Sequence, residues 1–182
     1  DVNGAGLLLT TEECLLSSVQ ARNPELTREH LETWMRDYLG IDRVLWLGNG
    51  IAGDDTHGHI DDLARFTSGD SIVMVSEDDP SDPNHAPLAE NWERVKSMPI
   101  RARKLPMPAA LSFDGVRLPA SYANFYVANR TVLVPAFNDP NDRIALNTLA
   151  ECFPGRQVIG INCVELVRGL GTLHCMTQQQ PA

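Results

Sequence analysis

Cysteine and long apolar runs are scarce in this chain, and each scarcity excludes a class of protein. Four cysteines stand among 182 residues, and no two of them form a Cys-x-x-Cys pair. This excludes a zinc knuckle, a thioredoxin-like motif and a disulfide scaffold. No apolar run reaches the ~20 residues that a membrane helix needs, and no signal peptide opens the sequence. We expect no membrane partner and a cytoplasmic location.

Positive charge is also in short supply. Lys and Arg number 15 against 24 Asp and Glu, which gives a formal net charge of -9. An acidic surface repels phosphate backbones, so no nucleic-acid partner is expected. The length and the 43% share of hydrophobic residues suit a single globular domain with a core of its own.

The sequence has no initiator methionine. It begins at Asp1 and passes through Gly4 and Gly6 straight into the apolar run 7–10. This arrangement reads as a turn that feeds a strand already under way, and it predicts a further segment before residue 1.

The chain repeats one layout three times. An Asx-Pro pair occurs at Pro24, Pro83 and Pro140, 59 and 57 residues apart, and each predicts the start of a helix. Strands are expected before and after each helix, at 7–10 with 14–16, 44–47, 64–66, 72–75, 102–105, 125–127, 132–134 and 158–160. The pattern predicts an α/β fold of strand, strand, helix, strand modules over approximately 1–50, 51–110 and 111–182. Residue pattern alone leaves open a sandwich or a ring of modules.

The first predicted helix has clear boundaries. Thr27 is a suitable N-cap and Gly40 a suitable stop. Leu31, Trp34, Met35 and Tyr38 follow one another at helical spacing.

The densest polar cluster spans residues 54–62. Its pattern His57-x-His59-x-Asp61 suits a metal if the segment is extended, because alternate side chains then share one side. A metallo-hydrolase would typically have His at position 62, where this chain has Asp. His174 is the one further histidine that could plausibly join such a site.

A second cluster surrounds Cys175. Gly169 and Gly171 precede it and a polar run follows it, unlike the other three cysteines, which we interpret as small buried side chains. A single Cys with a distant His is a pattern typical of a nucleophile, and His59 lies 116 residues upstream. A third polar segment offers Ser121 and Asn124 as hydroxyl and amide donors for a pocket wall.

Together these segments resemble the agmatine deiminase and bacterial peptidylarginine deiminase family. The matching pieces run in order along the whole chain: 8–15, 44–47, Gly53-Asp54 with Gly58-His59-Ile60-Asp61, 117–122 with 124–126, and His174-Cys175 with 177–179. The resemblance implies the pentein fold, a pseudo-fivefold αβ propeller, of which this chain would supply the C-terminal three modules of five as one catalytic domain.

The resemblance also implies a reaction and a set of roles. Agmatine and water would give N-carbamoylputrescine and ammonia, a step toward putrescine and polyamines, with no metal and no cofactor. Cys175 would be the nucleophile, His59 the general acid/base and Asp61 a ligand of the guanidinium. The expected substrate-binding residues are Asp54, Asp55, Ser121, Asn124 and Gly171.

Some family features are altered or missing. A Gly-Gly-Gly-Asn run usually precedes the Cys, and Leu170 interrupts it here, where it would narrow or reshape the pocket. Two acidic motifs that the family carries upstream are absent, so this chain alone is expected to be weakly active or inactive. The alternatives are a peptidylarginine-deiminase-like enzyme, a metal-dependent hydrolase, and a non-catalytic remnant whose unclosed sheet edges pair into a homo-oligomer.

Overall fold

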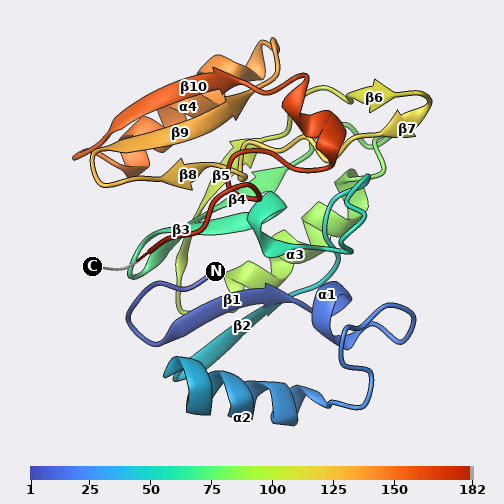
Figure 1. The fold of residues 1–182 in the computed structure, drawn as a ribbon, viewed down its shortest axis with the longest axis vertical. Coiled ribbons are helices and arrows are strands. Elements are labelled where there is room, and N and C mark those ends of the chain that lie inside the picture. Colours follow the sequence, from blue (N-terminus) through green and yellow to red (C-terminus); the bar gives the residue numbers. More distant parts are fainter. Residues whose placement is uncertain (181–182) are drawn as a thin grey trace.

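The chain folds into three α/β units, which follow one another in sequence and pack on a shared core (Figure 1). The computed structural model describes residues 1–180. The first unit contains β1 (Leu7–Thr11), α1 (Glu12–Leu16), α2 (Arg28–Leu39) and β2 (Arg43–Leu47). The second unit contains β3 (Ala64–Ser68), β4 (Ser71–Ser76), α3 (His85–Lys96) and β5 (Arg101–Pro106). The third unit contains the β6–β7 hairpin (Ser112–Phe113 and Val116–Arg117), β8 (Tyr126–Val127), β9 (Thr131–Ala136), α4 (Asn141–Cys152) and β10 (Gln157–Asn162).

Each unit pairs its strands in the same way. In the second unit β4 lies between an antiparallel β3 and a parallel β5, and in the third β9 lies between an antiparallel β8 and a parallel β10. In the first unit β1 and β2 are parallel, and Val2 bridges Leu8 in the antiparallel position. A helix connects each parallel pair, because parallel strands require a crossover.

Local chemistry explains the boundaries of α2. The Thr27 side chain accepts a hydrogen bond from the backbone of His30, and Gly40 ends the helix at φ 65°. The apolar residues at helical spacing differ in burial. Leu31 is buried, whereas Trp34 is 50% exposed and Tyr38 is 81% exposed. Helical spacing shows which side chains share a face and not whether another element covers that face.

One predicted strand is a helix instead. Residues 14–16 belong to α1, whose N-cap is Thr11 at the end of β1. The Thr11 hydroxyl accepts from the backbone N–H of Cys14 at 3.1 Å. Glu12 and Glu13 stand in the first helical turn, where acidic side chains favour a helix.

The central strands carry the core. Ile72, Val73, Met74 and Val75 in β4 are at most 1% exposed, and β9 contributes buried valines. Strands covered on both faces are typical of such runs of apolar residues. No helix among residues 1–180 has both the length and the apolar character needed to cross a bilayer.

Two glycines allow the loop after β2 to cross itself at close range. A Cβ on Gly50 would lie 2.4 Å from the Cα of Gly58. The carbonyl of Gly58 also accepts a hydrogen bond from the buried Thr11 hydroxyl at 2.6 Å. His59 follows directly, so the crossing and the end of β1 together determine where its backbone lies.

We expect Gly50→Ala to lower the free energy of unfolding by roughly 1–3 kcal/mol, because the added methyl forces the backbone of the crossing apart. Urea unfolding followed by circular dichroism measures the change. Gly155→Ala is the matched control, since nothing lies within 4 Å of its new methyl and its backbone is ordinary. An equal loss in the two variants would contradict this account of the crossing.

Candidate active site

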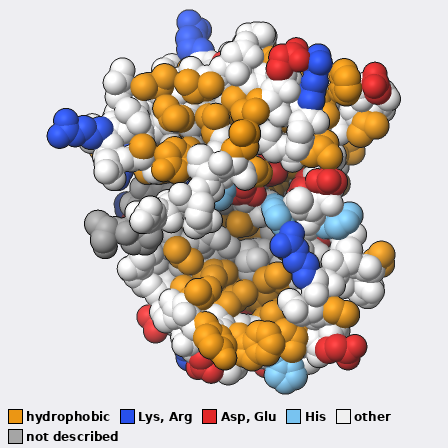
Figure 2. Space-filling model, in the orientation of Figure 1, with side chains coloured by type: hydrophobic (Ala, Val, Ile, Leu, Met, Phe, Trp, Pro, Cys, Tyr) orange, Lys and Arg blue, Asp and Glu red, His pale blue; other side chains and the backbone are white. Residues whose placement is uncertain are grey.

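The structure brings His59 and Cys175 to one cavity of about 520 Å³. His59 precedes a short 3-10 turn at Ile60–Asp62, and Cys175 lies in the loop that follows a second such turn at Leu166–Gly169. Figure 2 shows this face of the molecule, where a hollow crosses between the upper and lower halves and histidine, acidic and basic side chains gather along it.

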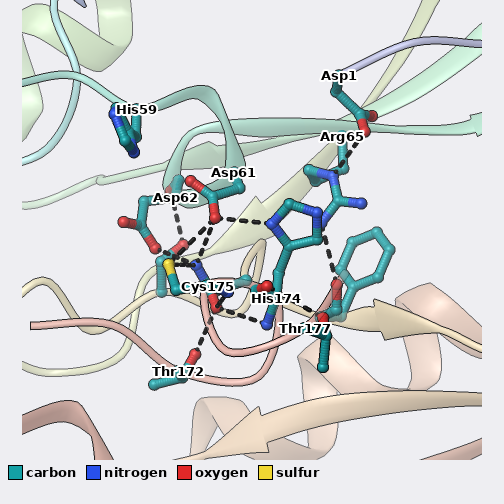
Figure 3. A network of polar contacts seen from close by, with 12 residues as sticks. Asp1, His59, Asp61, Asp62, Arg65, Thr172, His174, Cys175 and Thr177 are labelled. Carbon is teal, nitrogen blue, oxygen red and sulfur yellow. Dashed lines mark hydrogen bonds and ion pairs between the residues drawn. The ribbon is translucent and has the colours of Figure 1, made fainter. Parts of the chain in front are cut away.

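Within the cavity, a thiol is in contact with a carboxylate. The Cys175 Sγ lies 3.1 Å from Asp61 Oδ2, and His174 Nδ1 lies 2.7 Å from the same oxygen. The Asn124 amide nitrogen donates toward Asp61 Oδ2 at 3.2 Å, Asp62 Oδ1 at 2.8 Å and the Cys175 sulfur at 3.0 Å. Figure 3 shows these side chains converging, with His59 apart from them on the other side of Asp61.

The other end of the Asn124 amide holds the loop that carries the thiol. Its carbonyl oxygen accepts from the Thr172 hydroxyl at 2.9 Å, from the backbone of His174 at 2.9 Å and from that of Cys175 at 3.3 Å. Asn124 is only 1% exposed, so water does not compete for these bonds. One buried amide therefore joins the loop of Cys175 to the turn of Asp61 and Asp62.

The two adjacent carboxyl groups differ in protonation. Burial alone raises the pKa of Asp61, but hydrogen bonds from His174 and Cys175 and the positive charges of His174 and Arg65 outweigh it and lower that pKa to about 2. Burial raises the pKa of Asp62 well above its usual range, and the charge of Asp61 adds to the effect. Asp61 is therefore the stable anion of the pair.

Arg65 lies behind this pair as a buried cation. Burial lowers its pKa to about 10, and the acids Asp61 and Asp62 oppose that change. Its Nη1 donates to the Phe125 carbonyl at 3.0 Å, and its Nε lies 3.1 Å from Asp1 Oδ1, an ion pair without hydrogen-bond alignment.

The thiol of Cys175 is protonated at neutral pH. Partial burial of the sulfur, followed by the negative charges of Asp61 and Asp62, raises its pKa to about 12, and the hydrogen bond from Asn124 only partly offsets these effects. A free cysteine has a pKa near 8.5, so this environment suppresses the thiolate unless a positive charge comes close.

The other predicted binding residues occupy different places. Asp55 lines the cavity and is exposed. Asp54 faces its own loop, where its carboxylate accepts from the backbone of Thr56 at 2.8 Å and of His59 at 2.8 Å. Ser121 is fully buried and donates to the Asp62 carbonyl at 2.7 Å. Neither of these two side chains lines the cavity.

Gly171 lies against Cys175. A Cβ on Gly171 would meet the Cys175 Cβ at 2.8 Å and its Sγ at 3.0 Å, so a side chain there would displace the sulfur. Its neighbour Leu170 lines the same cavity with a left-handed backbone, at φ 64° and ψ 28°. A leucine rarely adopts that conformation, and such strain is concentrated at functional sites.

The alternative metal site does not form. His57 is exposed and has φ 63°, so the segment turns there and is not extended. Alternate side chains then lose their common direction. Among residues 1–180, the His, Cys, Asp and Glu groups whose ligand atoms gather within 4.8 Å are Asp61, Asp62 and Cys175, without His57 or His59.

Four residues of the network had no expected role in a deiminase site: Asp62, Arg65, Thr172 and His174. The sequence offered a signal for two of them. Asp62 forms a doublet with Asp61, and His174 precedes Cys175, although it was considered only as a metal ligand. Arg65 and Thr172 contact the site through the fold, and no local pattern marks them.

Solved structures share this arrangement of units. The agmatine deiminase of Enterococcus faecalis is 35% identical with a TM-score of 0.93, over 99% of this chain and 55% of that one. An agmatine deiminase of C. jejuni with substrate bound is 35% identical with a TM-score of 0.91, over 96% and 52%. An amidinotransferase from Microseira wollei, 15% identical with a TM-score of 0.56 over 94% and 41%, shares the fold alone. The chain spans about half the length of the curated relatives it matches, from 53% to 56%.

The fold therefore places this chain in the α/β structural class that agmatine deiminases and an amidinotransferase have in common. A family model described as Porphyromonas-type peptidyl-arginine deiminase matches residues 1–181. The chain belongs to that family.

We expect the alkylation of Cys175 by iodoacetamide to accelerate about tenfold for each pH unit between pH 7 and 10, because its pKa of about 12 lies above that range. Mass spectrometry of the Cys175 peptide gives the rate. Asp61→Asn removes a neighbouring negative charge, lowers the thiol pKa, and should speed alkylation at pH 8 about tenfold.

The matched control is Asp70→Asn, which removes an exposed carboxylate paired with Arg101 on the surface. Its alkylation rate should equal that of the parent chain. A rate in the parent that levels off below pH 9 would show that the carboxylates do not suppress the thiolate.

Proposed function

We propose that this chain carries the nucleophile and the acid/base of a deiminase that hydrolyses agmatine to N-carbamoylputrescine and ammonia. The observation that carries the proposal is the 3.1 Å contact between the Cys175 sulfur and Asp61, inside a cavity that His59 also lines. A guanidinium is planar and cationic, and carboxylates bind it through charge-assisted hydrogen bonds. The same cavity thus offers a charge partner and a nucleophile for one small group.

The proposed reaction consumes agmatine and water and needs no other reactant. The Cys175 thiol gives its proton to His59 while its sulfur attacks the guanidinium carbon, and the sulfur–carbon bond forms. His59 gives a proton to one nitrogen, which leaves as ammonia and breaks its bond to that carbon. His59 then takes a proton from water, whose oxygen attacks the same carbon of the covalent thiouronium. The carbon–sulfur bond then breaks and the sulfur takes the proton from His59, which restores the thiol. The carbamoyl product gives up the remaining proton of the substrate cation, which passes to ammonia.

The substrate's own charge can supply the missing activation. Burial, as the larger cause, and the nearby Asp61 and Asp62 together raise the pKa of Cys175 to about 12. A guanidinium bound beside the carboxyl groups and the sulfur would offset that negative charge and favour the thiolate. The cysteine would then become reactive when substrate is present and stay inert toward other electrophiles when it is not.

The walls of the cavity support an unbranched substrate. Leu166, Leu170 and Met176 line it beside the polar groups. Such apolar contacts suit the four methylenes of agmatine. The similarity to two agmatine deiminases of known structure favours the same substrate.

We expect Cys175→Ala, in the complete protein, to abolish ammonia release from agmatine, because no other thiol reaches the cavity among residues 1–180. Cys152→Ala, at the end of α4, is the control and should retain the parent rate. An assay of agmatine, free arginine and an arginine-containing peptide side by side identifies the substrate. If the peptide is hydrolysed faster than agmatine, a peptidyl arginine takes the place of agmatine as the proposed substrate. If Cys175→Ala still releases ammonia, the cysteine mechanism is wrong.

We expect Leu170→Gly to raise the KM for agmatine roughly tenfold, because the cavity loses an apolar wall that contributes ~1.5–3 kcal/mol when well packed. The control is Asp114→Gly in the β6–β7 hairpin, which also relieves a positive φ, of 50°, but lies outside the cavity. Equal KM values for the two variants would show that Leu170 does not contact the substrate.

A further inference from the structure

One arginine of the chain reaches the imidazole of His59. The Nη2 of Arg22 lies 2.6 Å from the Nε2 of His59. Arg22 stands on the exposed segment between α1 and α2, 37 residues before the histidine. Short backbone bonds shape this segment, from Ala21 to the Ser17 carbonyl at 3.2 Å and from Leu26 to the Asn23 carbonyl at 3.0 Å.

The chemistry of the two groups determines where the imidazole proton resides. A guanidinium has five N–H donors and no acceptor. Nε2 of His59 can therefore hold this contact only as an acceptor, with its lone pair unprotonated and directed at the Arg22 N–H and with the ring uncharged. The proton of the neutral ring must then be on Nδ1.

The backbone and the ring of His59 are held from two sides. Its backbone N–H donates to Asp54 Oδ2 at 2.8 Å, which anchors the residue in its loop. The carbonyl of the preceding Gly58 is held by the Thr11 hydroxyl. Within residues 1–180, the imidazole ring of His59 makes its hydrogen-bonding contact with Arg22. This contact therefore sets the orientation of the ring.

We propose that Arg22 is a positioning residue for His59, which keeps the imidazole neutral and in the form that carries its proton on Nδ1. Nε2 then carries a lone pair and no proton, and once the contact with Arg22 opens it is the base that the removal of a proton from a thiol or from water requires. The effect on turnover rests on the proposed function, whereas the pairing of the two side chains does not. Because Arg22 and the substrate carry the same guanidinium group, both interact with His59 by the same chemistry.

Nitrogen NMR of the histidine rings tests the pairing directly at pH 8. The His59 signal is assigned by its loss in His59→Gln. In the parent we expect Nε2 to show the shift of an unprotonated nitrogen and Nδ1 that of a protonated one. In Arg22→Met, which removes both the donor and the charge, a second population with protonated Nε2 should appear. Arg22→Lys should restore the parent spectrum, since it keeps a cationic donor.

Turnover in the complete protein tests the consequence. Arg22→Met should lower kcat for agmatine about tenfold with little change in KM, because the base is misplaced while the carboxylates still bind the substrate. Arg22→Lys should recover to within about threefold of the parent. Arg36→Met on α2 is the matched control; it removes an exposed arginine outside the cavity and should change neither readout.

Three results would overturn the proposal: protonated Nε2 in the parent, the same His59 spectrum in Arg22→Met as in the parent, or a higher kcat in Arg22→Met, as expected if Arg22 blocks the cavity. If Cys175→Ala is inactive and the His59 spectrum does not respond to Arg22, the Arg22 proposal alone fails. If the spectrum responds and agmatine is not hydrolysed by the parent, the deiminase proposal alone fails.

Discussion

The buried amide of Asn124 is the contact on which the candidate site depends. Its nitrogen lies within hydrogen-bond distance of two carboxyl groups and a sulfur, and its oxygen accepts hydrogen bonds from the loop that carries that sulfur. An amide can do both because it carries two N–H donors and a carbonyl acceptor. Replacing it by Asp would put a third carboxyl group beside two others, and an apolar residue would leave several buried polar groups without partners, which is costly.

This arrangement places negative charge around the thiol of Cys175, which the proposed mechanism requires to lose a proton. Asp61 stays ionised through its bonds from His174 and Cys175, and its charge opposes the thiolate. Such an environment is poor for a general cysteine nucleophile and suitable for one whose partner is a cation. In the function proposed above, the same electrostatic cause accounts both for an inert thiol in the free protein and for selectivity toward a guanidinium.

The repeated units explain how distant segments meet. The cavity is lined by two stretches, the segment between β2 and β3 and the segment after β10, and packing of the units on one core brings these two stretches together. The crossing at Gly50 and Gly58 and the hydroxyl of Thr11 then place the backbone of His59. Ser121 and Asp54 act in the same supporting way, since both bind backbone groups of the site and neither lines the cavity.

Local sequence determined much of the secondary structure. The runs at 72–75 and 132–134 are strands, and Thr27 and Gly40 bound a helix, because β-branched side chains, a capping hydroxyl and a left-handed glycine act over a few residues. The segment 14–16 was misjudged because its apolar letters suit a strand, while the Thr11 cap and two glutamates favour a helix.

The tertiary structure alone decided which chemical groups meet. The sequence singled out His59, Asp61, Asn124 and Cys175. Their contacts follow from packing over separations of up to 114 residues, as does the participation of Asp62, His174 and Arg22. The turn at His57, which keeps this residue from acting as a metal ligand beside His59, also became visible only in the structure. Caps and periodicity act through neighbours in the chain and can be read from it. Burial, hydrogen-bond partners and protonation depend on neighbours in space, which only the folded chain supplies.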